Sequence, residues 1–257
     1  MPRIEKVGKA RAQRAVERQL DYMCRLGDEW KGMEDQVVSD MIDKSNRVRT
    51  VLERLKPIKP TDRVLEVGSG ATGIIFNFGG DHNVGVDPLA DHLRELFLWQ
   101  RSSKVPTIAA GGENLPFEDA RFDVVFSDNV IDHAPDPAKI ISEIARVLKP
   151  GGLFYFTVNV HHSIYHFSSR AYGIWKRFGL PGEITPFADH TVHLTVHAAK
   201  SLFDGLPFRI IENKVDLDAA MDEARTSPPR HLGDRLKRLF FKNAVFEVVA
   251  VREPTQP

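Results

Sequence analysis

The chain has 257 residues, 42% of them hydrophobic and 27% charged, a balance typical of a globular protein with a substantial core. Its 35 basic residues equal its 35 acidic ones, so no overall charge attracts nucleic acid. The single cysteine, Cys24, excludes an internal disulfide and a cysteine-rich metal cluster, and no stretch is apolar for long enough to span a membrane. Residues 1–20 carry charges of both signs and lack the apolar core of a signal peptide, so we expect a cytoplasmic protein.

The first sixty residues are expected to be helical. Residues 1–34 are basic and compatible with a helix, and apolar residues recur at helical spacing from 37 to 55. Pro57 and Pro60 then end the pattern. We therefore predict a helical cap over residues 1–60 and one larger domain over 61–257. The pattern leaves open whether the helices cover a ligand cleft or only pack on a sheet.

The most informative segment is 63–73, where an apolar strand runs into a glycine-rich turn. The turn contains Gly68, Ser69, Gly70 and Gly73. This G-x-G-x-x-G spacing is typical of a strand, a tight turn and a helix that let backbone approach a nucleotide closely. Glu66, near the end of the strand, is unusual for a dinucleotide site, because pyrophosphate gains from helix N-terminal amides and not from a carboxylate. Glu66 therefore favours a ligand with a cationic group.

The next two predicted strands end in residues suited to a nucleoside. The strand 84–86 leads into Asp87 and Pro88, and an acid at this offset can hold the hydroxyls of a ribose, whether of adenosine or of NAD. The strand 107–110 leads to a segment that contains Glu113, Asn114 and Leu115. A polar side chain there could reach the amino edge of adenine while Leu115 packs on the ring.

Two further predicted strands flank a helix. Residues 122–129 form a buried strand that ends in a polar tip of Ser127, Asp128 and Asn129. Apolar residues at helical spacing predict a helix over 137–148, which the Pro-Gly-Gly sequence at 150–152 stops before a strand at 153–158. Farther on, Thr195 is expected to cap a short helix that ends near 203, and strands are predicted at 208–215 and 244–251.

Residues 64–158 resemble the class I, Rossmann-like S-adenosylmethionine-dependent methyltransferases, especially the small-molecule group that includes the ubiquinone-biosynthesis enzymes. The matching pieces lie in family order at 65–70, 84–87, 113–117, 122–125 and 148–152. The resemblance implies a doubly wound α/β sheet, mostly parallel with an antiparallel last strand. Segments that leave the later strands emerge at the ligand edge of such a sheet, so insertions at about 159–194 and 218–242 are expected to form the substrate wall.

The resemblance also implies S-adenosylmethionine as the cofactor and assigns residues to its parts. Gly68 and Gly70 would border the methionine part, and Asp87 would hold the ribose. The tip at 127–129 would flank the amino-acid end and the methyl group. The expected cofactor-binding residues are Glu66, Gly68, Ser69, Gly70, Gly73, Asp87, Pro88, Glu113, Asn114, Leu115, Ser127, Asp128 and Asn129. One departure is Asp132, where many relatives have glutamate or histidine.

Three histidines are candidates for catalysis. His133, His161 and His162 each follow the end of a predicted strand, and imidazole titrates near neutral pH, so one of them could take a proton from the acceptor. Structural hydrogen bonding is the main alternative. Positioning alone can also suffice for methyl transfer. We expect no metal, because the histidine spacing does not fit a ligand set.

The leading function is methyl transfer to an oxygen, nitrogen or carbon atom of a small-molecule or carrier-linked acceptor. The alternatives are a protein methyltransferase and a non-catalytic S-adenosylmethionine-binding regulator. No nucleic-acid partner is expected. The basic stretch 230–242 is expected to form a lid helix, and the alternative is peripheral contact with a membrane. The sequence sets neither the acceptor nor the oligomeric state.

Overall fold

The computed structural model describes residues 9–162, 192, 194–226 and 244–254, which contain one seven-stranded sheet. The strands are β1 (Arg63–Val67), β2 (His82–Val86), β3 (Thr107–Ile108), β4 (Phe122–Asp128), β5 (Leu148–Val160), β6 (Phe208–Val215) and β7 (Ala244–Arg252). They lie in the order β3-β2-β1-β4-β5-β7-β6. Strand β7 is antiparallel to both of its neighbours, and the other neighbouring strands are parallel. This arrangement confirms the predicted Rossmann-like methyltransferase sheet.

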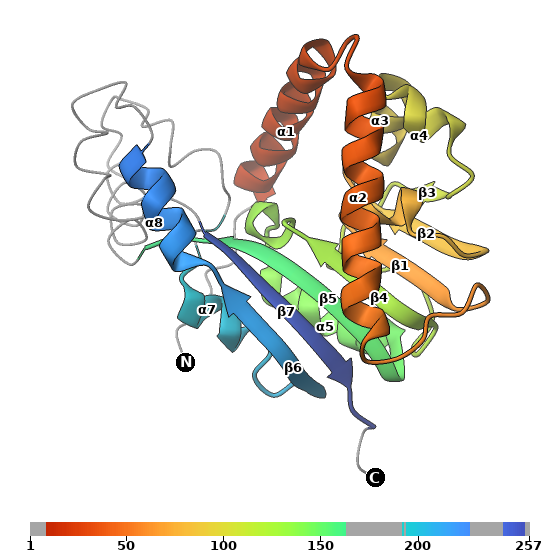
Figure 1. The fold of residues 1–257 in the computed structure, drawn as a ribbon, viewed down its shortest axis with the longest axis vertical. Helices are drawn as coiled ribbons and strands as arrows, with labels where there is room; N and C mark the ends of the chain where they lie inside the picture. Colours follow the sequence, from red (N-terminus) through yellow and green to blue (C-terminus); the bar gives the residue numbers. More distant parts are fainter. Residues whose placement is uncertain (1–8, 163–191, 193, 227–243, 255–257) are drawn as a thin grey trace.

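Helices cover both faces of the sheet (Figure 1). The described helices are α1 (Lys9–Glu29), α2 (Glu34–Glu53), α3 (Ala90–Leu96), α4 (Leu98–Ser102), α5 (Pro137–Val147), α7 (Val196–Ser201) and α8 (Leu217–Thr226). Two short 3-10 helices, η1 (Ile74–Asn77) and η2 (Ile131–His133), follow β1 and β4. Helix α2 lies on one face, and α5 and α7 lie on the other. None of the described helices is long and apolar enough to cross a bilayer.

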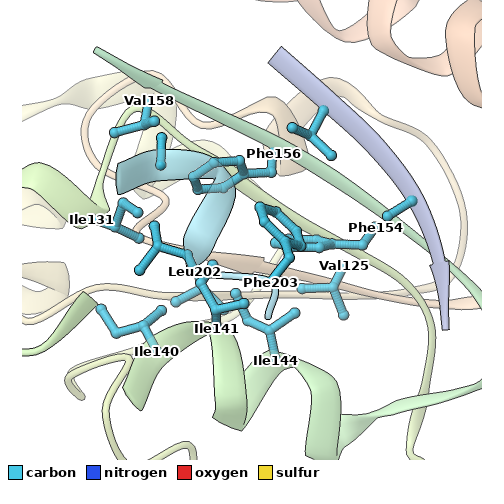
Figure 2. Packing of buried hydrophobic residues seen from close by; sticks show 14 of the residues in the cluster. Val125, Ile131, Ile140, Ile141, Ile144, Phe154, Phe156, Val158, Leu202 and Phe203 are labelled. Carbon is cyan, nitrogen blue, oxygen red and sulfur yellow. The ribbon is translucent and has the colours of Figure 1, made fainter. Parts of the chain in front are cut away.

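The alternation of side chains along the central strands divides the core into two layers. Val125, Phe154 and Phe156 face α5 and α7, where they pack with Ile140, Ile144 and Phe203 (Figure 2). The intervening residues point to α2 and η1 on the opposite face; they are Val124, Phe126, Leu153 and Tyr155. Because both faces are buried, these strands read in the sequence as nearly continuous apolar runs.

The predicted helix ends are close to the observed ones. Helix α5 starts at Pro137, and its N-cap residue Asp136 accepts a hydrogen bond of 3.2 Å from the backbone N–H of Lys139. Thr195 caps α7 as predicted, since its hydroxyl accepts from the backbone N–H of Ala198 at 3.2 Å. Strand β5 begins earlier than predicted, because Leu148 already pairs with Phe122 across a bulge.

The segment after the glycine turn differs from the expected helix. It forms only the four residues of η1, which Gly79 and Gly80 follow with φ angles of +78° and +108°. Glycine adopts this left-handed backbone readily, and it ends the helical run there. The turn is therefore followed by a short 3-10 helix whose first amide groups donate to the side chain of Glu66.

The N-terminal helices pack directly on this part of the domain. Val48 and Leu52 of α2 lie in the same apolar layer as Val64 and Phe126 of the sheet. The hydroxyl of Ser45 donates a buried hydrogen bond of 2.8 Å to the carbonyl of Ile74. The division at residue 60 stays a prediction. Most of the two predicted insertions also stay predictions, since residues 163–191, 193 and 227–243 lie outside the described residues.

Candidate active site

The glycine turn connects β1 to η1 at the carboxyl edge of the sheet. Gly68 has a φ of +80°, and a Cβ there would lie 2.3 Å from Cγ1 of Val130. The backbone N–H of Gly68 donates to the carbonyl of Val86 at 2.6 Å. Gly70 also has a positive φ of +49°, and a Cβ there would meet nothing within 4 Å. Gly68 thus fits against the segment that follows β4, and Gly70 faces open space.

Glu66 binds the chain's own backbone. Its Oε1 accepts from the N–H of Ile74 at 3.2 Å, and its Oε2 accepts from the N–H of Ile75 at 2.9 Å. Gly73 leaves room for this carboxyl group, because a Cβ there would lie 2.6 Å from Oε2. Burial raises the pKa of Glu66 to about 8, against the effect of the two amide hydrogen bonds.

The position of Glu66 bears on which ligand the glycine turn can bind. The first amides of a helix after a glycine turn are the groups that bind pyrophosphate in dinucleotide sites. Here the amides of Ile74 and Ile75 already donate to a buried carboxyl group. This arrangement disfavours pyrophosphate at the turn. A direct role of Glu66 toward a cationic ligand stays a prediction.

Asp87 lies directly after β2 and is buried. Its Oδ2 accepts from the N–H of Gly70 at 2.9 Å, and its Oδ1 accepts from the N–H of Leu89 at 2.8 Å. Burial raises the pKa of Asp87, while the two amides act in the opposite direction. A carboxylate has about four acceptor positions, so two remain for the hydroxyls of a ribose. Asp87 can therefore hold the turn and a ligand together. Pro88 separates it from Leu89.

Two side chains of α4 hold the carbonyl groups of the glycine turn. The indole N–H of Trp99 donates to the carbonyl of Ala71 at 2.8 Å. Nε2 of Gln100 donates to the carbonyl of Gly70 at 2.6 Å and to that of Ala71 at 3.0 Å. Neither residue could be predicted from the sequence, because both lie about thirty positions from the turn and follow no motif. Trp30, after α1, packs on Trp99 with ring centroids 5.8 Å apart.

The segment after β3 brings one polar atom to the interior. Oε1 of Glu113 is buried and has no hydrogen-bond partner among the described residues, so it suits a donor such as the amino group of adenine. Asn114 is exposed. Leu115 is buried in the layer that faces α5, and its backbone N–H donates to Oε2 of Glu143 at 3.0 Å. The contact of Leu115 with adenine stays a prediction.

The predicted polar tip lies at the end of β4. Oδ1 of Asp128 accepts from the hydroxyl of Thr157 at 2.7 Å, and Oδ2 forms an ion pair with Lys44 of α2. Ser127 is buried, and its hydroxyl lacks a hydrogen-bond partner within the described part of the chain. Asn129 is exposed with a φ of +55°, and its side chain accepts from the N–H of Asn159 at 3.2 Å.

The three candidate histidines follow β4 and β5, which are neighbouring strands. The side chain of His133 is 31% exposed, with Nε2 3.9 Å from Oδ2 of the buried Asp132. His161 is buried, and its backbone N–H donates to the carbonyl of Leu194 at 2.7 Å. His162 is partly buried. Among the described residues, no three metal-binding side chains gather into a possible metal site.

A cleft of about 230 Å³ lies between α2 and the glycine turn. It is lined by Trp30, Val37, Asp40, Met41, Lys44 and Thr72. Thr72 belongs to the glycine turn, and Lys44 is the partner of Asp128. The N-terminal helices therefore supply one wall of a cleft beside the candidate cofactor residues.

Comparison with known proteins identifies a methyltransferase domain in this part of the chain. Residues 65–156 match the family described as a methyltransferase domain. An uncharacterized methyltransferase of Mycobacterium sp. (strain JLS) is 35% identical over 99 residues, which is 38% of this chain and 38% of that protein. Sterol 24-C-methyltransferase of Gibberella zeae is 35% identical over 104 residues, covering 38% of this chain and 27% of the enzyme.

The solved structures agree on the fold. Geranyl diphosphate C-methyltransferase from Streptomyces coelicolor A3(2) superimposes with a TM-score of 0.58 at 15% identity, covering 85% of this chain and 83% of that one. Residues 65–156 therefore resemble the class I S-adenosylmethionine-dependent methyltransferases in sequence, and the sheet has their fold. The chain spans less than half of the length of either relative named above. The narrower likeness to the ubiquinone-biosynthesis enzymes stays a prediction.

Proposed function

We propose that this protein is an S-adenosylmethionine-dependent methyltransferase that acts on a small-molecule or carrier-linked acceptor. The observation that carries the proposal is the pair of carboxyl groups beside the glycine turn. Glu66 occupies the amides that pyrophosphate would need, and Asp87 holds the turn while keeping acceptor positions for a ribose. The relatives named as a sterol and a geranyl diphosphate methyltransferase support a small-molecule acceptor.

The residues fit the parts of this cofactor. Asp87 would hold the ribose. Oε1 of Glu113, which has no hydrogen-bond partner in the described part of the chain, would accept from adenine. Gly70 leaves the open space in which a ligand can approach the backbone. When bound, S-adenosylmethionine supplies a methyl group on a sulfonium.

The chain's own contribution to the reaction is orientation and, for some acceptors, removal of a proton. Strands β4 and β5 pair as far as Asp128 and Thr157, so the tip at 127–129 lies beside the last part of β5. Where the acceptor atom carries a proton, His133, His161 or His162 would take it as the new bond to carbon forms. An acceptor that already has a free electron pair needs only to be held in line.

The proposal is tested first by ligand choice. S-adenosylhomocysteine should raise the melting temperature of the purified protein, and NAD and NADP should not, because a ligand stabilises the state to which it binds. A larger shift with NADP would overturn the assignment. Transfer of a labelled methyl group to a metabolite pool then separates the enzyme from a regulator that only binds the cofactor.

A further inference from the structure

The cleft beside the glycine turn contains two opposite charges. Asp40 and Lys44 lie four positions apart on α2, so they share one face of the helix, and both line the cleft. Thr72, on the opposite wall, belongs to the turn that would hold the cofactor under the proposed function. The further inference rests on that function and concerns the end of the cofactor that meets α2.

Lys44 connects the N-terminal helices to the end of β4. Its Nζ forms an ion pair with Oδ2 of Asp128, although the two residues are 84 positions apart in the sequence. The two side chains are 34% and 15% exposed, so water screens their charges less than on an open surface. The other oxygen of Asp128 accepts from the hydroxyl of Thr157 at 2.7 Å. The pair therefore lies at the edge of the cleft and the sheet.

A second ion pair at the opposite end of the same strand provides a comparison. Nζ of Lys149 donates to both oxygens of Asp123 at 2.8 Å, and Lys149 therefore uses two of its donors on one carboxylate. Lys44 uses one donor on Asp128, and it has no second hydrogen-bond partner among the described residues. An ammonium group has three donors. Lys44 therefore keeps donors for a ligand, and it lines a cleft.

We propose that Lys44 binds the carboxylate of the amino-acid end of S-adenosylmethionine, while Asp128 faces its ammonium group. The amino-acid end is a zwitterion, so it offers each member of the Lys44–Asp128 pair an opposite charge. Two ion pairs with the ligand then replace one ion pair within the protein, and no charge is left buried without a partner. Lys44 is thus a specificity-determining residue, supplied by the N-terminal helices and not by a sequence motif of the domain.

The test compares two ligands that differ only at this end. S-adenosylhomocysteine has the amino-acid end, and 5′-methylthioadenosine has a methyl group in its place. Calorimetry of Lys44→Met should show an affinity for S-adenosylhomocysteine about tenfold to a hundredfold lower, with binding of 5′-methylthioadenosine unchanged. Lys44→Arg keeps the charge and should retain most of the affinity. The unchanged binding of the shorter ligand also verifies that the variant is folded.

The matched control is Lys149→Met, which removes the comparable ion pair at the far end of β4 and should alter the affinity for neither ligand. Equal loss of both ligands in Lys44→Met would mean that Lys44 only supports the fold, and unchanged S-adenosylhomocysteine binding would mean that it does not reach the ligand. Either result overturns the inference and leaves the proposed function intact. Failure of the unaltered protein to bind either ligand would instead overturn the proposed function.

Discussion

Gly70 donates its backbone N–H to Oδ2 of Asp87 over 2.9 Å, and this hydrogen bond joins the glycine turn to the end of β2. The sequence motif predicts both residues as ligand contacts, but it does not predict that they bind each other. Because the same carboxylate also accepts from Leu89, Asp87 organises the loops before a ligand arrives. Such preorganisation lowers the cost of ordering the site on binding.

Asp87→Ala should weaken the binding of S-adenosylhomocysteine by ~1–3 kcal/mol, because charge-assisted hydrogen bonds to the ribose are lost. Calorimetry with the 2′-deoxy analogue of S-adenosylhomocysteine separates the loss of the ribose hydrogen bonds from damage to the glycine turn. The unaltered protein should prefer the natural ligand to the analogue, and the variant should not. Asp119→Ala, at an exposed ion pair with Arg146, serves as the control and should keep the preference. A full preference in Asp87→Ala would remove Asp87 from the ribose site.

Gly68 is under two constraints that a second glycine allows us to separate. Gly68→Ala meets both a φ of +80° and the side chain of Val130, whereas Gly151→Ala meets a φ of +75° with nothing within 4 Å. The left-handed backbone costs an alanine ~1–2 kcal/mol, and overpacking adds ~1–3 kcal/mol. Urea unfolding should therefore show a larger loss of stability for Gly68→Ala than for Gly151→Ala. Equal losses would argue against the close packing of Gly68 on Val130.

The buried carboxyl group of Glu66 should make the stability of the protein depend on pH. Its folded pKa of about 8 lies above the ordinary value of 4.5, so between these values the folded state holds a proton that the unfolded state has released. The contribution of Glu66 to the free energy of unfolding is fully present below pH 4.5 and is lost as the pH rises through 8. The slope from this group approaches ~1.4 kcal/mol per pH unit at most.

Glu66→Gln tests this dependence because a glutamine has no proton to lose. Urea unfolding at several pH values from 5 to 9 should give a decline in the unaltered protein that is reduced in the variant. Glu118→Gln is a suitable control, since Glu118 is 90% exposed and lies outside the site. Parallel curves for the unaltered protein and Glu66→Gln would show that Glu66 is ionised in both states.

Much of the fold could be predicted because burial leaves periodic traces in the sequence. The apolar runs of β4 and β7 and the helical spacing of Ile140, Ile141 and Ile144 in α5 predicted those elements almost to their ends. Helices α3 and α4 were missed, since they are short and only a few of their residues are buried. A short helix offers too few turns for a period to appear.

Only those residues of the candidate site that belong to a sequence motif could be predicted. The glycines and Asp87 belong to a pattern that the backbone geometry requires. Gln100 and Lys44 meet their partners across 30 and 84 positions, and a contact between two single side chains leaves no pattern in either segment. These contacts follow from the packing of α4 and α2, which the sequence does not determine locally.

The last prediction concerns the proton acceptor. The side chain of His133 is partly exposed and lies beside a buried carboxyl group, Asp132, which can orient its ring. His161 is buried, so its replacement should also disturb packing. If His133 removes a proton, His133→Ala should lower turnover on an identified acceptor by ~10²–10⁴ while binding of S-adenosylhomocysteine changes little. The measurement is single-turnover methyl transfer with calorimetry on the same variant, and His92→Ala on α3 is the control. If His133→Ala, His161→Ala and His162→Ala all keep full turnover, the enzyme acts by positioning alone and contains no base among these histidines.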